Sequence, residues 1–228
     1  MSTGGDGAAW EPKAEAAWRS PVAWLVLLGT FALGISADLW SKSEAFARVA
    51  LEPVVLESGQ LTADPDWQLP WHPGIRVLGP DLLDFHLVLN HGAVFGIGQH
   101  RRGAFIVLTL VAISAGLLVF ARWTTRRAHL AHVAIGLILA GGVGNLYDRV
   151  VFGAVRDFLH MLPRRELPFG LHWPGGSAEV FPWVFNIADV LLLTGMSMLL
   201  IQAALADRAE RRRARLAVEP EAEATAAP

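Results

Sequence analysis

Residues 21–40 read PVAWLVLLGTFALGISADLW, an apolar run with an aspartate, Asp38, near its end. A bilayer core of roughly 30 Å is crossed by about 20 mostly apolar residues in an α-helix, so this run predicts a membrane span. It resembles the core of a signal peptide. However, it is too long for one, and Asp38 and Lys42 stand where a small-residue cleavage site would follow. We therefore expect a retained span.

Three further runs of similar length predict spans at residues 103–121, 129–147 and 181–205. The composition agrees, because 53% hydrophobic and 18% charged residues are too apolar for an ordinary soluble domain. The net charge is −2 and the cations are not interleaved with aromatics, so we expect no nucleic-acid partner. The absence of cysteine excludes disulfides, thiolate metal sites and a cysteine nucleophile.

The positions of lysine and arginine predict the orientation of the spans. They flank the first span on its N-terminal side, fill the connection between the second and third spans, and follow the fourth span. Cytoplasmic loops carry the excess of such cations, so these three segments, and with them both termini, are predicted to be cytoplasmic. The cations concerned are Lys13, Arg19, Arg122, Arg126, Arg127, Arg208, Arg211, Arg212, Arg213 and Arg215.

This topology gives one membrane domain with two long loops outside the cytoplasm. The first loop contains short β-rich runs at residues 75–78 and 85–89, separated by Gly79 and Pro80, which predict a small sheet on the outer membrane surface. The tail from Glu219 to Pro228 consists mainly of alanine, glutamate and proline, without larger apolar residues, and is predicted to be disordered. The expected division is a cytoplasmic tail 1–20, a membrane domain 21–205 with outer loops 41–102 and 148–180, and a cytoplasmic tail 206–228.

Polar residues gather at the outer ends of the predicted spans, where ionisable groups are costly and mark functional sites. On the fourth span, Asn186 and Asp189 are three residues apart and share a helix face. On the third, Gly141 and Gly144 would let another helix approach closely. Asp157, in the second outer loop, offers a second carboxylate at similar depth. The polar residues are Asp38, Lys42, Asn90, Asn145, Asp148, Arg149, Asp157, Asn186 and Asp189.

Two carboxylates held close together share a proton, so one can activate water while the other polarises a peptide carbonyl. Other chemistries have weaker support. No Gly-x-Ser-x-Gly motif is present. His129 and His132 lack an intervening Glu and are predicted to pack at the cytoplasmic interface. The residue patterns alone leave two alternatives open: an intramembrane hydrolase, and a small transporter or channel with a polar outer-side cluster.

Five motifs in order resemble those of the lipoprotein signal peptidases, the family also called signal peptidase II. The resemblance covers nearly all of the chain except both tails. The motifs are DLWSK (38–42), NHGAVF (90–95), GGVGNLYDR (141–149), VRDF (155–158) and FNIAD (185–189).

The resemblance implies a bacterial inner-membrane aspartyl endopeptidase with Asp157 and Asp189 as its catalytic dyad. The substrate would be a prolipoprotein carrying diacylglycerol on its lipobox cysteine, cut just before that cysteine. The implied fold is all-α, with four transmembrane helices plus a small extracytoplasmic β-cradle. We expect a monomer in contact with membrane lipids, without metal or cofactor. The residues expected to bind substrate or support the site are Asn90, Gly92, Asn145, Arg149, Asn186, Ala188, Asp38 and Lys42.

Two intervals are longer than the family leads us to expect, residues 43–89 and residues 157–189. The second is rich in proline, glycine and arginine, and we interpret it as an inserted surface loop. The transporter alternative would use Asp38, Asp189 and Arg149 as a substrate or proton path. It would predict helix breaks or inverted repeats, and the sequence shows neither.

Overall fold

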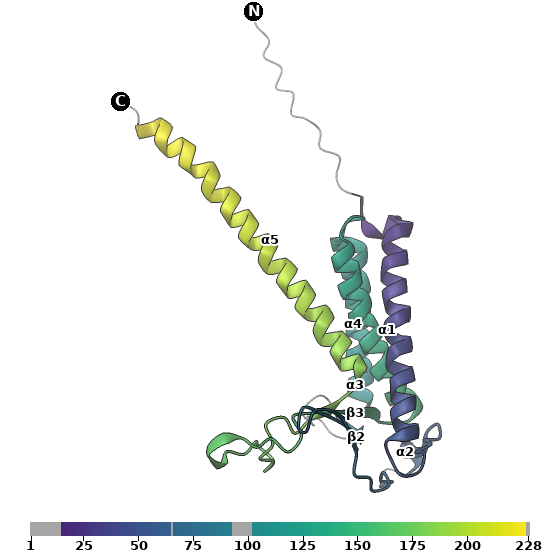
Figure 1. The fold of residues 1–228 in the computed structure, drawn as a ribbon. Helices are drawn as coiled ribbons and strands as arrows, with labels where there is room; N and C mark the ends of the chain where they lie inside the picture. Colours follow the sequence, from purple (N-terminus) through teal and green to yellow (C-terminus); the bar gives the residue numbers. More distant parts are fainter. Residues whose placement is uncertain (1–14, 65, 93–101, 227–228) are drawn as a thin grey trace, which may run out of the picture.

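The computed structural model describes residues 15–64, 66–92 and 102–226, with side chains as far as residue 213. Lys13 and residues 93–95, which the predictions above use, lie outside these ranges. The described part contains four helices long and apolar enough to cross a membrane, with a small sheet at one end of the bundle (Figure 1). The predicted fold class is confirmed. The helices are α1 (Pro21–Arg48), α3 (Arg102–Trp123), α4 (His129–Val151) and α5 (Ile187–Ala226).

The start of α1 follows directly from its sequence. Pro21 occupies the first helical turn, where its missing N–H costs nothing. Ser20 is the N-cap, and its hydroxyl accepts a hydrogen bond from the Ala23 N–H at 3.3 Å. Just before it, a short 3₁₀ turn, η1 (Ala17–Arg19), is tied to the connection between α3 and α4 by the Ala17 N–H, which donates to the Thr124 carbonyl at 2.9 Å.

Helix α4 is the centre of the bundle and packs against α1, α3 and α5. Glycines let its backbone approach its neighbours. A Cβ at Gly141 would overlap the Ala188 carbonyl of α5, and a Cβ at Gly144 would overlap the Asp38 carboxylate of α1. The prediction that these two glycines permit close helix packing is confirmed. Because of them, the polar ends of three helices meet at one level.

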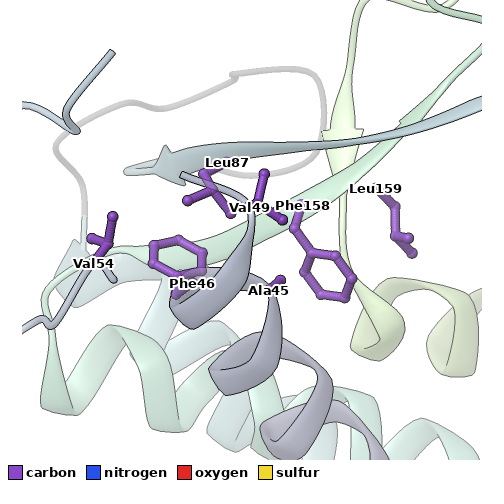
Figure 2. Close-up of a cluster of buried hydrophobic side chains, with 7 residues drawn as sticks. All are labelled: Ala45, Phe46, Val49, Val54, Leu87, Phe158 and Leu159. Carbon is purple, nitrogen blue, oxygen red and sulfur yellow. The ribbon is translucent and has the colours of Figure 1, made fainter. Parts of the chain in front are cut away.

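The sheet is antiparallel, with strand order β1-β2-β3-β4. Its strands are β1 (Ile75–Leu78), β2 (Leu83–Asn90), β3 (Val155–Met161) and β4 (Val184–Phe185). An apolar cluster joins the sheet to the end of α1, as Figure 2 shows. The cluster consists of Ala45, Phe46, Val49, Val54, Leu87, Phe158 and Leu159.

The register of β3 fixes where its polar residues lie. Val88 of β2 stands opposite Asp157, and Asn90 stands opposite Val155. Residues two apart on a strand share a face, so Asn90 and Asp157 project to the same side of the sheet. The neighbouring Arg156 projects to the other side. The predicted runs at 75–78 and 85–89 both belong to this sheet. The sheet also contains β3, which the sequence did not reveal as a strand.

The predicted start of the fourth span and the predicted disorder of the C-terminal tail are wrong. The fourth span does not start at residue 181, because Val184 and Phe185 pair with β3 as β4 and the helix begins at Ile187. A short apolar run does not by itself distinguish a strand from a helix. Residues 219–226, predicted to be disordered, continue α5, in keeping with their high content of the helix formers alanine and glutamate.

The first outer loop also begins later than predicted, since α1 continues to Arg48, and it contains a four-residue helix, α2 (Gln60–Ala63). Between β3 and β4 the chain forms a long excursion, residues 162–183, which we call the arm. It includes a 3₁₀ turn, η3 (Pro168–Gly170), and reaches sideways from the sheet (Figure 1).

The glycine contacts of α4 predict that Gly144→Ala lowers the free energy of unfolding by about 1–3 kcal/mol, because the new methyl group displaces the Asp38 carboxylate. Gly142→Ala is the matched control, since its Cβ would meet nothing nearer than Ile113 at 3.7 Å. Thermal unfolding of the purified variants in detergent measures the difference. Equal melting temperatures for the two variants would contradict this packing.

Candidate active site

The first turn of α5 is capped from two sides. Asn186 is its N-cap residue, and its Oδ1 accepts from the Asp189 N–H at 3.1 Å while Asp189 Oδ2 accepts from the Asn186 N–H at 3.2 Å. This reciprocal pair is a capping box, and the helix dipole favours a carboxylate at this place. The next free donor, the Ala188 N–H, donates to Asp38 Oδ1 of α1 at 2.8 Å. Asp189 is therefore held in one position by the start of its own helix.

Lys42 lies fully buried beside this turn and joins α1 to α4. Its Nζ lies 2.8 Å from Asp38 Oδ2 and 3.2 Å from Asp148 Oδ2, and it donates to Asn145 Oδ1 at 3.1 Å. The ammonium group thus donates two hydrogen bonds, to Asp38 and Asn145, and forms a second ion pair with Asp148, so its charge is compensated by two carboxylates. Asp38 and Lys42, four residues apart on α1, thus form an ion pair, and Asp148 extends it to the end of α4.

Asp148 fixes the strand that follows α4. Its Oδ2 accepts from the Arg156 backbone N–H at 3.0 Å, and its Oδ1 accepts from Arg156 Nε at 3.1 Å and Nη2 at 2.8 Å. The Arg156 guanidinium also stacks over Phe152, 4.5 Å from the ring centroid. These contacts hold β3 at a set height above the helix end, and Asp157 is the next residue along it.

Asp157 is buried and faces two amide side chains. Asn90 Nδ2 donates to its Oδ2 at 3.0 Å, and Asn186 Nδ2 donates to its Oδ1 at 2.5 Å. Burial raises the pKa of Asp157 to about 7, with a further increase from the negative charge of Asp189, while the two amide donors oppose the shift. A proton at this site is therefore exchanged near neutral pH, in the range a general acid or base requires.

Two asparagines bridge the carboxylates. Asn145 donates through Nδ2 to Asp189 Oδ1 at 2.8 Å, and its Oδ1 accepts from Asn186 Nδ2 at 3.0 Å. Asn186 in turn contacts Asp157. The amide of Asn145 is oriented by Lys42, which donates to the same oxygen, so its nitrogen must face Asp189. Asp157 and Asp189 thus belong to one hydrogen-bonded network although they lie on a strand and a helix.

Arg149 closes the network on the side of β2. Its Nη2 donates to the Gly92 carbonyl at 2.8 Å and its Nη1 to the Asn145 carbonyl at 3.3 Å. The Gly92 N–H donates to Asn90 Oδ1 at 2.9 Å, so Gly92 is fixed from both sides. Arg149 does not pair with its neighbour Asp148, whose carboxylate is occupied by Lys42 and Arg156.

All ten residues predicted to be catalytic, to bind substrate or to support the site lie in this one network. The structure gives positioning roles to two more, Asp148 and Arg156. The sequence showed Asp148 as a polar residue at the end of the third span and Arg156 as part of the VRDF motif. Neither role was predicted, because the two residues meet across the turn from helix to strand. The ten are Asp38, Lys42, Asn90, Gly92, Asn145, Arg149, Asp157, Asn186, Ala188 and Asp189.

The arrangement suits proton transfer. It offers two carboxyl groups in a low-dielectric setting, each oriented by amide donors, with an arginine beside them. Within the described ranges, no group of three or more His, Asp or Glu side chains is placed to hold a metal ion.

Comparison with known proteins shows similarity to the signal peptidases II. The sequence model of the family described as signal peptidase (SPase) II matches residues 30–205. The chain is similar to the lipoprotein signal peptidase of Desulfitobacterium hafniense, at 33% identity over 133 residues, 58% of this chain and 76% of that protein. It is also similar to that of Symbiobacterium thermophilum, at 31% identity over 137 residues, 60% of this chain and 80% of that protein.

A similar fold occurs in a solved structure described as a bacterial membrane enzyme. That structure matches with a TM-score of 0.56 at 22% identity, and the match covers 88% of this chain and 96% of the other. At this identity the match shows a common fold.

The buried position of Lys42 predicts that Lys42→Met lowers the free energy of unfolding by about 3–5 kcal/mol, because the buried Asp38 carboxylate loses its cation and Asp148 keeps only Arg156. Arg48→Met is the matched control on the same helix. Arg48 pairs with Glu44 four residues before it, as Lys42 does with Asp38, but is 76% exposed, so its loss costs at most about 1 kcal/mol. Unfolding in detergent at fixed pH gives both values, and similar losses would refute the buried-cation account.

Proposed function

The chain belongs to the signal peptidase II family, which removes signal peptides from bacterial prolipoproteins, and we propose that it does so as an aspartyl endopeptidase with Asp157 and Asp189 as its dyad. The substrate is a prolipoprotein with diacylglycerol on its cysteine, and the bond before that cysteine is cut. The observation that carries this proposal is the network in which Asn145 and Asn186 join two carboxyl groups, one of which has a pKa of about 7.

We place the site at the outer face of the bacterial inner membrane. The support is the common location of the arginine-rich segments at the opposite end of the bundle. There the Arg126 guanidinium pairs with Glu15 at 2.7 Å, and the chain before α1 hydrogen-bonds to the connection between α3 and α4. Such cation-rich segments stay in the cytoplasm, so the sheet end faces outward and both termini face the cytoplasm.

The reaction proceeds without a covalent bond between the enzyme and its substrate. The ionised carboxylate takes a proton from water as the water oxygen attacks the carbonyl carbon, while the protonated carboxyl group donates to the carbonyl oxygen. The tetrahedral species then breaks its C–N bond as the nitrogen receives the proton that the base took from water, which returns the base to its ionised form. The products are a carboxylate at the end of the signal peptide and a free amine on the lipidated cysteine.

The surroundings of the two groups favour Asp157 as the carrier of the shared proton. Its raised pKa keeps it protonated up to neutral pH. Burial disfavours the ionised form of Asp189 as well, but Asp189 accepts from the Asn186 N–H and from Asn145 Nδ2 at the start of a helix, and the cations Lys42 and Arg149 also stabilise its ionised form. Asp189 is therefore the base that activates water, and Asp157 is the acid that polarises the carbonyl. Arg149 lies beside the pair and stabilises the developing oxyanion.

The transporter alternative has less support. A substrate or proton path would require polar side chains through the thickness of the bundle. The central helix α4 carries only alanine, glycine, valine, leucine and isoleucine from Ala134 to Gly144, and its charged and amide groups begin at Asn145.

Replacing either carboxyl group by an amide tests the dyad. Asp157→Asn and Asp189→Asn should each lower the rate of cleavage by about 10²–10⁴-fold, since each removes a proton-transfer group. Asp81→Asn, on the turn before β2, is the carboxylate control, because Asp81 pairs only with arginines of the arm. A gel-shift assay with diacylglyceryl-modified prolipoprotein measures the rate. Full activity in either dyad variant would disprove the assignment.

The pKa of Asp157 predicts the pH dependence of turnover. The proton on Asp157 is lost as the pH rises through about 7, so kcat should fall on the alkaline side of that value. Asn90→Ala removes a donor that stabilises the carboxylate, which raises the pKa and moves the alkaline limb to higher pH. Profiles of kcat against pH for both proteins provide the test. A limb that moves to lower pH in the variant would argue against Asp157 as the acid.

A further inference from the structure

The tip of the arm presents apolar side chains that are left uncovered by the part of the chain that the structure describes. Phe169 is 98% exposed and Leu171 is 57% exposed. Phe169 also has a left-handed backbone conformation, with φ 61° and ψ 22°. This region is unfavourable for a bulky residue, and such strain persists only where the surrounding structure imposes it. An aromatic ring displayed in this way points to a contact outside the chain.

The arm has a defined shape, set by contacts along its length. At its base, Arg164 Nη1 donates to Asp84 Oδ2 at 2.6 Å and Nη2 donates to the Pro80 carbonyl at 2.7 Å. Further out, the Leu167 N–H donates to the Ala178 carbonyl at 2.7 Å and Trp173 Nε1 donates to the Glu179 carbonyl at 2.9 Å. The two sides of the arm are thus bonded to each other, and the tip is carried at a fixed place relative to the sheet.

The direction of the arm indicates that its partner is the lipid beside the bundle. Figure 1 shows the arm at the level of the sheet, reaching sideways on the side toward which α5 leans. The long axes of α1 and α4 run across the membrane, so the arm extends along the membrane plane. It therefore lies above the lipid beside the bundle. A loop made for a soluble partner would be expected to project beyond the sheet, away from the helices.

We propose that the tip of the arm, residues 169–171, inserts into the lipid headgroup region of the leaflet at the sheet end of the bundle. Aromatic and aliphatic side chains are stable at the boundary between headgroups and acyl chains. Arg165 stands at the base of the arm beside Asp81, 3.5 Å away, so the tip binds through its apolar side chains. The contact holds the sheet, and with it Asp157, at a constant height relative to the bilayer. Only the identity of the leaflet, the outer one, rests on the proposed function.

The chain has no cysteine, so one introduced cysteine gives a unique label. Phe169→Cys and Leu171→Cys would each be labelled with nitrobenzoxadiazole in phosphatidylcholine–phosphatidylglycerol nanodiscs. Two reference positions give the quenching expected for a label in water and for a label within the bilayer. Asp64→Cys is an exposed residue at the end of α2, and Leu193→Cys is a 63% exposed residue on α5 within the bilayer. Quenching is measured with doxyl-labelled lipid and with aqueous iodide.

The proposal expects both tip labels to be quenched by doxyl lipid, as at Leu193, and to be shielded from iodide. Iodide quenching equal to that at Asp64 would overturn it. Shielding that develops only after prolipoprotein is added would also overturn it and would assign the tip to the substrate. None of these readouts involves cleavage, so failure here is distinguishable from failure of the proposed dyad.

Discussion

A single buried ammonium group, that of Lys42, determines how the parts of this site meet. It lies between Asp38 and Asp148, and each of these carboxylates has a second task. Asp38 accepts from the N–H of Ala188 and so sets the start of α5. Asp148 binds Arg156 and so sets the height of β3. The two proposed catalytic groups, on different elements, are positioned through one cation, whose removal would leave Asp38 without a counterion and Asp148 with Arg156 alone.

The sequence predicted the parts of this arrangement that depend on local pattern. Long apolar runs identified the four spans, and the glycines at 141 and 144 identified the close contacts of α4. The polar residues could be recognised as one set because each stands at the same end of a span, where charge is costly. Their grouping therefore followed from their positions relative to the predicted spans, whereas the assignment of roles required the family resemblance.

What the sequence missed depends on tertiary pairing. Val184 and Phe185 are as apolar as the helix that follows them, and only their pairing with β3 makes them a strand. Asn186 was expected on a helix face, but it is the N-cap, which directs its side chain toward Asp157 and Asn145 as well as to its own helix. Arg156 has a role only because the chain turns back on Asp148, a contact that no periodicity encodes.

The capping of α5 has a consequence for the biogenesis of the protein. Asn186 and Asp189 belong to the last span to leave the ribosome, while their partners Asp38 and Lys42 belong to the first. Chains begin to fold from the N-terminus during synthesis. A nascent chain with three inserted spans therefore has a buried cation and an unused acceptor, but no paired carboxyl groups. With the proposed dyad, the two carboxyl groups come together in one step, when α5 enters the bundle.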